Sequence, residues 1–271
     1  MYKIYKTGQE FLDDNLNIIR NDSIGTTFFE LDAKLIGQCD ANSWAVRVEA
    51  SGETLRAVRV DGLPLLIYGI ERCARELAAV VAENKLQFVK VLGYYELLNT
   101  FLTSYEQLAG GNHTVNLSMD IMRCEKVVPC DTSRVEKATE KDVEEITGLV
   151  VDFTFDALGE KPEWGKVFES VSRKINSYAL LRLDGHIVSI AASYDEGNGL
   201  TRLADVYTKP EHRNKGYSKK VVTYLTQQAI AGNNLPYLHV DKNNPVSNHL
   251  YLKIGYMYGK SRYEMEYRKT K

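Results

Sequence analysis

The stretch VYTKPEHRNKGYSKK, from Val206 to Lys220, decides how the second half of the chain folds. It begins as a run of β-branched and aromatic residues, which is typical of a strand, and this run stops at Pro210. A charged segment with a single glycine, Gly216, follows, and after it the residues read as a helix. The sequence therefore predicts a strand that enters a helix through a glycine-bearing turn at 213–218.

A turn of this kind is suited to binding an anion. Several backbone N–H groups point at one spot, and the helix N-terminus adds about half a positive charge, so phosphate groups bind there. Gly216 would let the backbone come close to a ligand. The side chains that could add a hydroxyl group or positive charge are Arg213, Lys215, Ser218 and Lys219. Spacing alone leaves an even choice between a phosphate site and a solvent-exposed loop, and the chain has neither a P-loop nor a dinucleotide-binding motif.

The residues after 133 alternate between strand and helix patterns. Thr139 and Asn244 are typical N-cap residues, Asp184-Gly185 is a strong hairpin signal, and Gly232 and Gly255 stand where helices would end. The predicted strands are 135–138, 178–183, 186–194, 200–208, 237–240 and 257–267. The predicted helices follow Thr139 and then span 164–175, 217–231 and 245–254.

The first half shows the later part of the same pattern. Its predicted strands are 44–49, 54–60, 63–68, 86–92 and 115–122, and its predicted helices are 71–84 and 94–108. With an offset of 146 residues, Tyr105 falls on Tyr251 and helix 71–84 falls on helix 217–230. Because the identities are few, a duplicated domain and a coincidence of two α/β patterns both stay open.

The composition is that of an ordinary globular protein, with 271 residues, 44% of them hydrophobic and 26% charged. This length suits one large or two medium domains. A polar, proline-containing stretch at 128–133 is the candidate boundary, so we expect two domains, 1–130 and 131–271.

Charge and cysteine content exclude several classes. A net charge of -2 does not suggest nucleic-acid binding, and no apolar run is long enough to cross a membrane. The start of the chain has no secretory pattern. The four cysteines, Cys39, Cys73, Cys124 and Cys130, have no metal-ligand spacing, so we expect reduced thiols in a cytoplasmic protein with no metal.

Two motifs together resemble those of the GNAT superfamily of N-acetyltransferases. Arg213-x-x-Gly216-x-Ser218 after a strand is similar to the first signature, although Ser218 replaces the usual glycine or alanine. NPVSNHLYLKIGY, from Asn244 to Tyr256, resembles the second motif. The resemblance covers about residues 133–271. It implies an α/β (α+β) fold, with a mixed, mostly antiparallel sheet flanked by helices, in two tandem domains of which the N-terminal one is a degenerate GNAT-like domain.

The resemblance also implies an acyl-CoA donor, with acetyl-CoA as the co-substrate. Its pyrophosphate would lie on residues 213–218, which include Asn214, Lys215 and Tyr217. The pantetheine arm would run along Val206, Tyr207 and Thr208, which requires this strand to part from the following one, and would also contact Asn244, Ser247 and Tyr251.

Three residues carry the implied chemistry. The amide of Val206 would polarise the thioester carbonyl, and Tyr251 would protonate the departing thiolate. Tyr251 could instead be a packing residue of its helix. Asp205 could accept the proton of the amine, directly or through water, or could be an edge-strand residue that faces solvent.

The sequence leaves more than one candidate for the general base, because Arg202 stands where the family often has a glutamate. His239 is a second candidate for the base, although a hydrogen-bonded core histidine is the alternative, and His186 beside a hairpin is interpreted as structural. An acidic acceptor pocket could include Asp152, Asp156 and Glu169. The acceptor itself cannot be read from the sequence.

The favoured function is an acetyl-CoA-dependent N-acetyltransferase that acts on a primary amine of a small molecule or a protein. The alternatives are an acyl-CoA-binding regulatory or scaffold protein with little turnover, and an acyltransferase that uses another donor. The first half has only Gly69-Ile70 between its strand and helix, so we expect it to lack the pyrophosphate turn and to wall the acceptor site. The oligomeric state stays unknown.

Overall fold

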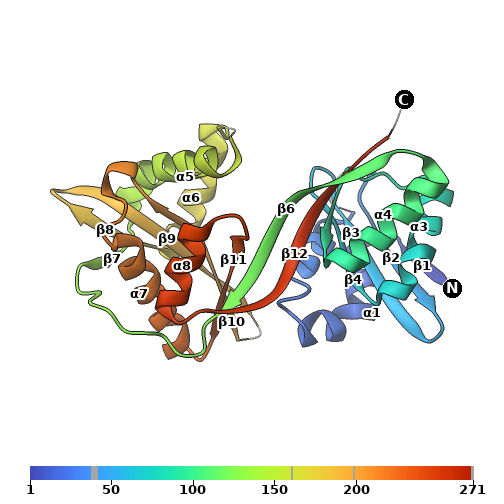
Figure 1. Ribbon diagram of the computed structural model, residues 1–271, viewed down its shortest axis with the longest axis horizontal. Helices are drawn as coiled ribbons and strands as arrows, with labels where there is room; N and C mark the ends of the chain where they lie inside the picture. The colour runs from blue at the N-terminus through green and yellow to red at the C-terminus, as the bar shows by residue number, and fades with distance from the viewer. Residues whose placement is uncertain (38–41, 160, 198, 270–271) are drawn as a thin grey trace. The chain divides into compact units, whose positions relative to one another are not determined.

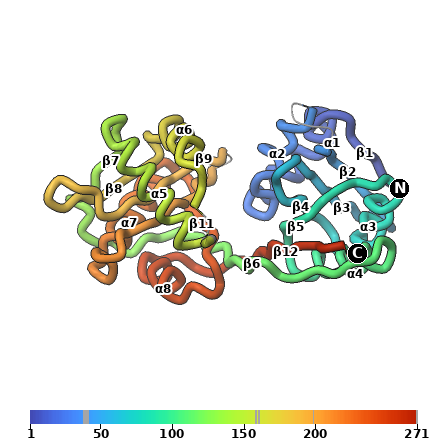
Figure 2. The backbone as a smooth tube through the Cα atoms, turned by 90° about the horizontal axis from the view of Figure 1, so that it is seen from above, coloured from blue at the N-terminus to red at the C-terminus, as the bar shows by residue number. Residues whose placement is uncertain are grey.

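The computed structural model describes residues 1–37, 42–159, 161–197 and 199–269 (Figure 1). Cys39 and residue 198 of the expected turn at 197–199 lie outside the described residues. The chain forms two compact units. The N-terminal unit consists of Met1–Met119 and Lys260–Lys271, and the C-terminal unit consists of Asp120–Gly259. Each unit contains both strands and helices, and their backbone path can be followed in Figure 2.

The C-terminal unit confirms the predicted mixed sheet. Its strands lie in the order β7-β8-β9-β10-β11-β6, where β6 is Asn112–Arg123. Strands β10 and β11 are parallel, whereas the pairs from β7 to β10 are antiparallel. Its elements are β7 (Val135–Lys137), α5 (Val143–Leu158), α6 (Trp164–Lys174), β8 (Tyr178–Leu183), β9 (His186–Gly197), β10 (Leu200–Thr208), α7 (Tyr217–Ala231), β11 (Leu235–Asp241) and α8 (Pro245–Ile254).

Local signals in the sequence explain these boundaries. Thr139 and Asp142 form a reciprocal capping box before α5. Asp184 and Gly185 both have positive φ, at 49° and 82°, as a two-residue hairpin between β8 and β9 requires. Asn244 accepts a hydrogen bond from the Ser247 N–H at the start of α8, so its predicted capping role is confirmed.

The N-terminal unit has three elements that the sequence patterns did not reveal: β1 (Tyr2–Tyr5), α1 (Gly8–Asn21) and α2 (Phe29–Leu35). The start of α1 carries a readable signal, because Thr7 accepts a hydrogen bond from the Glu10 N–H and Glu10 accepts one from the Lys6 N–H. The remaining elements are β2 (Trp44–Ala50), β3 (Glu53–Arg59), β4 (Leu65–Gly69), α3 (Ala74–Glu83), β5 (Lys90–Gly93) and α4 (Tyr95–Ala109).

One predicted strand begins too early. The expected strand at 86–92 is wrong in its first part, because β5 starts only at Lys90. The N–H groups of Asn84, Lys85 and Leu86 donate back to carbonyls in the last turn of α3, which keeps this segment out of the sheet. The strand is therefore short, and it pairs with β4 and β12 in the order β1-β2-β3-β4-β5-β12.

The two halves of the chain have the same order of helices and strands. With β1, α1 and α2 included, each half runs β-α-α-β-β-β-α-β-α-β. The halves end in β6 (Asn112–Arg123) and β12 (Met257–Arg268), and these strands are exchanged. Most of β12 belongs to the N-terminal unit and pairs with β5, whereas the end of β6 belongs to the C-terminal unit next to β11. The common order favours duplication over coincidence. The domain division 1–130 and 131–271 stays a prediction, since compactness does not measure which parts fold alone.

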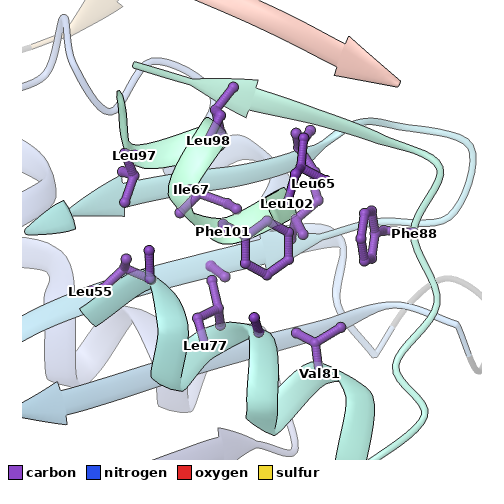
Figure 3. Close-up of a cluster of buried hydrophobic side chains, with 14 of the residues drawn as sticks. Leu55, Leu65, Ile67, Leu77, Val81, Phe88, Leu97, Leu98, Phe101 and Leu102 are labelled. Carbon is purple, nitrogen blue, oxygen red and sulfur yellow. The ribbon is translucent and has the colours of Figure 1, made fainter. Parts of the chain in front are cut away.

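Apolar side chains fill both faces of each sheet. In the N-terminal unit, Leu65 and Ile67 of β4 pack with Leu77 of α3 and Phe101 of α4 (Figure 3). A second cluster includes Phe11 of α1 and Phe29 of α2. The C-terminal unit repeats this arrangement, with α7 and α8 on one cluster and α5 and α6 on the other. Burial of these apolar faces is the main force that fixes the sheets and positions the strand ends.

Candidate active site

Strand β10 loses one of its two neighbouring strands halfway along its length. It pairs in parallel with β11 only from Leu200 to Leu203, so the register between the two strands ends before the strand does. On its other side, Ala204 lies opposite Ala192 and Tyr207 lies opposite Ile190, which leaves one extra residue in β10. Asp205 has a φ of 53° at this point. Residues 205 and 206 therefore form a β-bulge where β10 parts from β11, and bulges of this kind redirect backbone groups away from the ladder.

The turn after β10 has the backbone geometry of an anion site. Asn214 and Gly216 have φ values of 62° and 78°, in the left-handed region. Gly216 is the N-cap of α7 and has no side chain, so no side-chain oxygen caps the first N–H groups of this helix. A Cβ at Gly216 would meet no atom within 4 Å, so the turn is open on that side. Such a turn exposes several N–H donors to a ligand.

Arg213 holds the turn rather than projecting from it. Its Nε donates to the Thr208 carbonyl at 3.0 Å, and its Nη2 lies 2.6 Å from Asp156 Oδ2 on α5. The guanidinium carbon lies 5.5 Å from the centre of the Tyr207 ring. Asp156, which the sequence suggested for an acceptor pocket, is thus paired with the turn. The Lys215 Nζ donates to the Glu211 carbonyl at 3.0 Å.

Tyr251 is buried on the inner face of α8, with 6% of its surface exposed. Its cluster includes Tyr256, whose ring centre lies 5.8 Å away, and Val206 of the bulge packs against the same cluster. Burial raises the pKa of the Tyr251 hydroxyl well above its ordinary value, so the group keeps its proton at neutral pH. Within the described residues its hydroxyl makes no hydrogen bond. The structure thus brings Tyr251 and Val206 to one side of the sheet.

Asp205 is half-buried, so a simple solvent-facing role for this residue is wrong. Its Oδ2 accepts a hydrogen bond from the Tyr178 hydroxyl at 2.7 Å and another from the Tyr194 hydroxyl at 2.7 Å. Burial, and then the charge of Asp205, raises the pKa of both phenols. The pair of phenols fixes the carboxylate in one orientation.

The position of the missing glutamate is occupied by an ion pair. Arg202 Nε donates to Glu196 Oε1 at 2.6 Å, and its guanidinium carbon lies 5.0 Å from the centre of the Tyr194 ring. A carboxylate from β9 therefore lies near this part of β10, but it is bound to Arg202. His239 is half-buried with its ring 5.8 Å from that of Tyr237, and His186 is exposed beside its hairpin.

Sequence reasoning missed Asn248, which links α8 to β11. Its Nδ2 donates to the carbonyls of Asp241 at 2.9 Å and Asn244 at 2.8 Å, and Tyr258 donates to its Oδ1 at 3.2 Å. The residue is buried at 8% exposure. The only sign of this role in the sequence is the asparagine of PVSNHL, and its local sequence does not indicate which groups it binds. Asn248 holds the start of α8, with Asn244 and Ser247, against the end of β11.

Comparison with known proteins identifies this arrangement. The model of the acetyltransferase (GNAT) family matches residues 143–256, which span the bulge, the turn and α8. The C-terminal unit is a GNAT acetyltransferase domain. Membership supports acyl transfer in general. A search of curated proteins found no match.

Solved GNAT structures resemble the whole chain in fold. An acetyltransferase of the GNAT family from Colwellia psychrerythraea has a TM-score of 0.65 and 13% identity, and the match covers 99% of this chain and 100% of that one. A GCN5-related N-acetyltransferase from Sphaerobacter thermophilus has a TM-score of 0.62 and 12% identity, over 99% and 96% of the two chains. A tandem GNAT protein from the clavulanic acid biosynthesis pathway has a TM-score of 0.60 and 10% identity, over 99% and 98%. These likenesses extend the GNAT fold to both halves.

Two further properties of the described residues complete the description. None of their helices is both long enough and apolar enough to span a membrane. No group of three or more histidine, cysteine, aspartate or glutamate side chains among them is arranged to hold a metal ion.

Proposed function

We propose that the protein is an acetyl-CoA-dependent N-acetyltransferase that acetylates a primary amine. What supports this most is the parting of β10 from β11 after Leu203, beside a bulge and before an open, glycine-capped turn. A donor that is a chain of amides ending in phosphates fits a strand edge followed by an N–H-lined turn. The proposal includes a cytoplasmic location and a reaction that needs no metal ion, because the four cysteines have no metal-ligand spacing.

The donor would bind along a continuous path. The pyrophosphate would accept hydrogen bonds from the backbone of residues 213–218, and the pantetheine arm would extend β10 at 206–208. Asn244 and Ser247 lie at the N-terminus of α8, which Asn248 holds against the end of β11. In this arrangement Arg213 contributes chiefly by fixing the turn, because its guanidinium already binds Thr208 and Asp156.

The reaction requires a neutral amine, a stabilised oxyanion and a protonated leaving group. The amine nitrogen would attack the thioester carbon and form a tetrahedral intermediate, whose oxyanion the Val206 N–H would stabilise. When the C–S bond breaks, the Tyr251 hydroxyl would give its proton to the thiolate. Asp205, held by two phenols, would accept the proton released from the amine, directly or through water.

Binding of acetyl-CoA to the purified chain tests the donor site. We expect Gly216→Glu to weaken binding about 100-fold, because it forces a side chain into a left-handed position and puts a carboxylate where phosphate would lie. Gly185→Glu is the matched control, since Gly185 also has a positive φ of 82° with no atom near a Cβ, but it lies in the β8–β9 hairpin. Isothermal titration calorimetry that detects no binding by the wild type, or equal binding by both variants, would rule out this donor site.

The second candidate is an acyl-CoA-binding regulatory protein with little turnover. It is favoured by the Arg202–Glu196 pair, which removes a direct carboxylate base from the usual position. A thiol-release assay across a panel of amines separates the two, because a regulatory protein would bind acetyl-CoA and release no thiol above background hydrolysis. Other acyl-CoA donors in the same assay test the choice of acetyl group.

A further inference from the structure

The N-terminal unit contains a cavity of about 580 Å³ at the carboxyl ends of β4 and β5. The parallel pairing of these two strands ends at Leu66 and Leu92, so the cavity occupies the position at which β10 and β11 part in the other unit. The walls come from the start of the β4–α3 connection, from the first turn of α4 and from β12. The cavity therefore lies at the carboxyl ends of two parallel strands, which is where ligands commonly bind in such sheets.

Aromatic rings form much of the wall of this cavity. Tyr94 and Tyr95 lie at the start of α4, and the Tyr95 ring centre is 5.1 Å from that of Tyr263 on β12. The ammonium nitrogen of Lys260 lies 5.1 Å from the centre of the Tyr94 ring. The chain itself therefore places a cation against this wall, in the geometry of a cation–π interaction.

Carboxylates give the cavity a negative balance. Glu71 and Glu96 line it together with a single cationic side chain, Lys260. The Thr100 hydroxyl donates to Glu71 Oε1 at 2.7 Å, which orients that carboxylate. Neither glutamate forms an ion pair with any described residue. The two carboxylates together carry more charge than Lys260 and the half positive charge of the α4 N-terminus combined, so the cavity favours a cation over a phosphate.

We propose that this cavity binds a small organic cation, a primary ammonium ion attached to a compact aromatic group. The ammonium would lie between Glu71 and Glu96, and the ring would pack against Tyr95 and Tyr263. Because Tyr95 is 41% exposed, the cavity opens to solvent and a ligand can enter without unfolding the unit. This site is separate from the acetyl-donor site and does not depend on acetyl transfer.

Calorimetry on the full chain, without acetyl-CoA, tests the proposal with a pair of probes that differ in charge. Tyramine carries an ammonium group, and 3-(4-hydroxyphenyl)propionate carries a carboxylate on the same ring and the same two-carbon chain. We expect tyramine to bind at one site and the anion to bind at least about tenfold more weakly. Absence of tyramine binding at millimolar concentration, or equal affinity for both probes, would overturn the proposal.

Isosteric variants test whether tyramine binds in this cavity or in the C-terminal unit. The double variant Glu71→Gln, Glu96→Gln keeps the acceptor for Thr100, and it is expected to lower tyramine affinity about tenfold, since an exposed ion pair contributes up to about fivefold. Asp205→Asn in the C-terminal unit should leave that affinity unchanged. If Asp205→Asn abolishes tyramine binding and the double variant does not, tyramine occupies the C-terminal unit and the cavity proposal is wrong, whereas the proposed acetyltransferase function stands.

Discussion

The two units make the same strand-to-helix connection in different ways. In the C-terminal unit, β10 and α7 are joined by 209–216, with two left-handed residues, a short helical turn at Pro210–His212 and an arginine bound to Asp156. In the N-terminal unit, β4 ends at Gly69, only Ile70 follows it, and a helical turn begins at once with Glu71. One connection ends in uncapped N–H groups beside basic residues, and the other begins with a carboxylate. The same topology can therefore present opposite charge to a ligand.

This difference separates what the fold supplies from what the loop supplies. The fold places a parallel pair of strands and the start of two helices at one edge of each sheet. Loop length, glycine and charge then decide the chemical class of the ligand. Matched substitutions in the two units can test this separation.

The largest contrast is expected between two tyrosines 146 residues apart. The Tyr251 hydroxyl has no hydrogen bond within the described residues, and the Tyr105 ring packs 4.9 Å from that of Phe88 and 5.1 Å from that of Tyr267. We expect Tyr251→Phe to lower kcat about 100-fold with acetyl-CoA affinity within about twofold, since a general acid contributes on this scale. Tyr105→Phe should leave kcat unchanged. Steady-state kinetics with the best amine of the panel measures kcat for both variants. Equal kcat values would show that Tyr251 is not the general acid.

A second contrast concerns an aspartate–tyrosine pair in each unit. Asp205 accepts from Tyr178 and Tyr194, and Asp22 accepts from Tyr68 at 2.9 Å. Asp205→Asn should lower kcat/KM about tenfold or more by removing the proton acceptor, whereas Asp22→Asn should not. Steady-state kinetics of the two variants is the deciding measurement, and a kcat/KM that Asp205→Asn leaves unchanged would remove Asp205 as the proton acceptor.

Two buried carboxyl groups should respond to pH in opposite directions. Burial raises the pKa of Asp32 in α2 to about 6, so its contribution to stability is present below about pH 4 and is lost as the pH rises through 6. Burial also acts to raise the pKa of Asp142, but hydrogen bonds from Thr139 and the ion pair with Arg182 hold that pKa below its ordinary value. Its contribution is present above about pH 4 and is lost as the pH falls.

Urea unfolding at several pH values measures this contrast. At pH 7 we expect Asp32→Asn to raise the free energy of unfolding by about 2 kcal/mol and Asp142→Asn to lower it by about 2 kcal/mol. The difference for Asp32→Asn should shrink as the pH falls from about 6 to about 4, whereas the difference for Asp142→Asn should stay near its full size down to about pH 4 and shrink only below it. A gain for Asp32→Asn that persisted unchanged at pH 4 would show that its carboxyl group does not titrate in this range.

The smallest contrast concerns helix caps. Thr7 caps α1 and Asn244 caps α8, each through a side-chain oxygen. Alanine at either position should lower the free energy of unfolding by about 1 kcal/mol. Only Asn244→Ala should also weaken acetyl-CoA binding, which calorimetry measures. The same acetyl-CoA affinity in both variants would show that Asn244 caps the helix and does not contact the donor.

Local chemistry made much of the C-terminal unit predictable. Helix 217–231 and strand 200–208 have the predicted bounds, because Gly216 and Gly232 stand at the two ends of the helix and Pro210 follows the strand. The turn could be located for the same reason. The start of α1 carried an equivalent signal in Thr7 and Glu10, next to Gly8, but this signal was overlooked.

Other features depend on register across strands, and no local pattern encodes them. The bulge at Asp205 arises where β10 has one residue more than β9 between Ala204 and Tyr207. Tyr178 and Tyr194 reach Asp205 because two hairpins align three strands, so their partnership could not be read from any one segment. Asn248 was missed for a similar reason, since its partners lie on β11 and beyond α8.

The exchange of β6 and β12 has a consequence for the order in which the chain is synthesised. The N-terminal unit takes its last strand from residues 260–268, and the ribosome reaches these residues only after it has made the rest of the protein. Until then β5 presents an unpaired edge, which in a nascent chain invites pairing with other strands. The half that is made first is thus completed last, and a chain that stops before residue 260 leaves the N-terminal unit without its final strand.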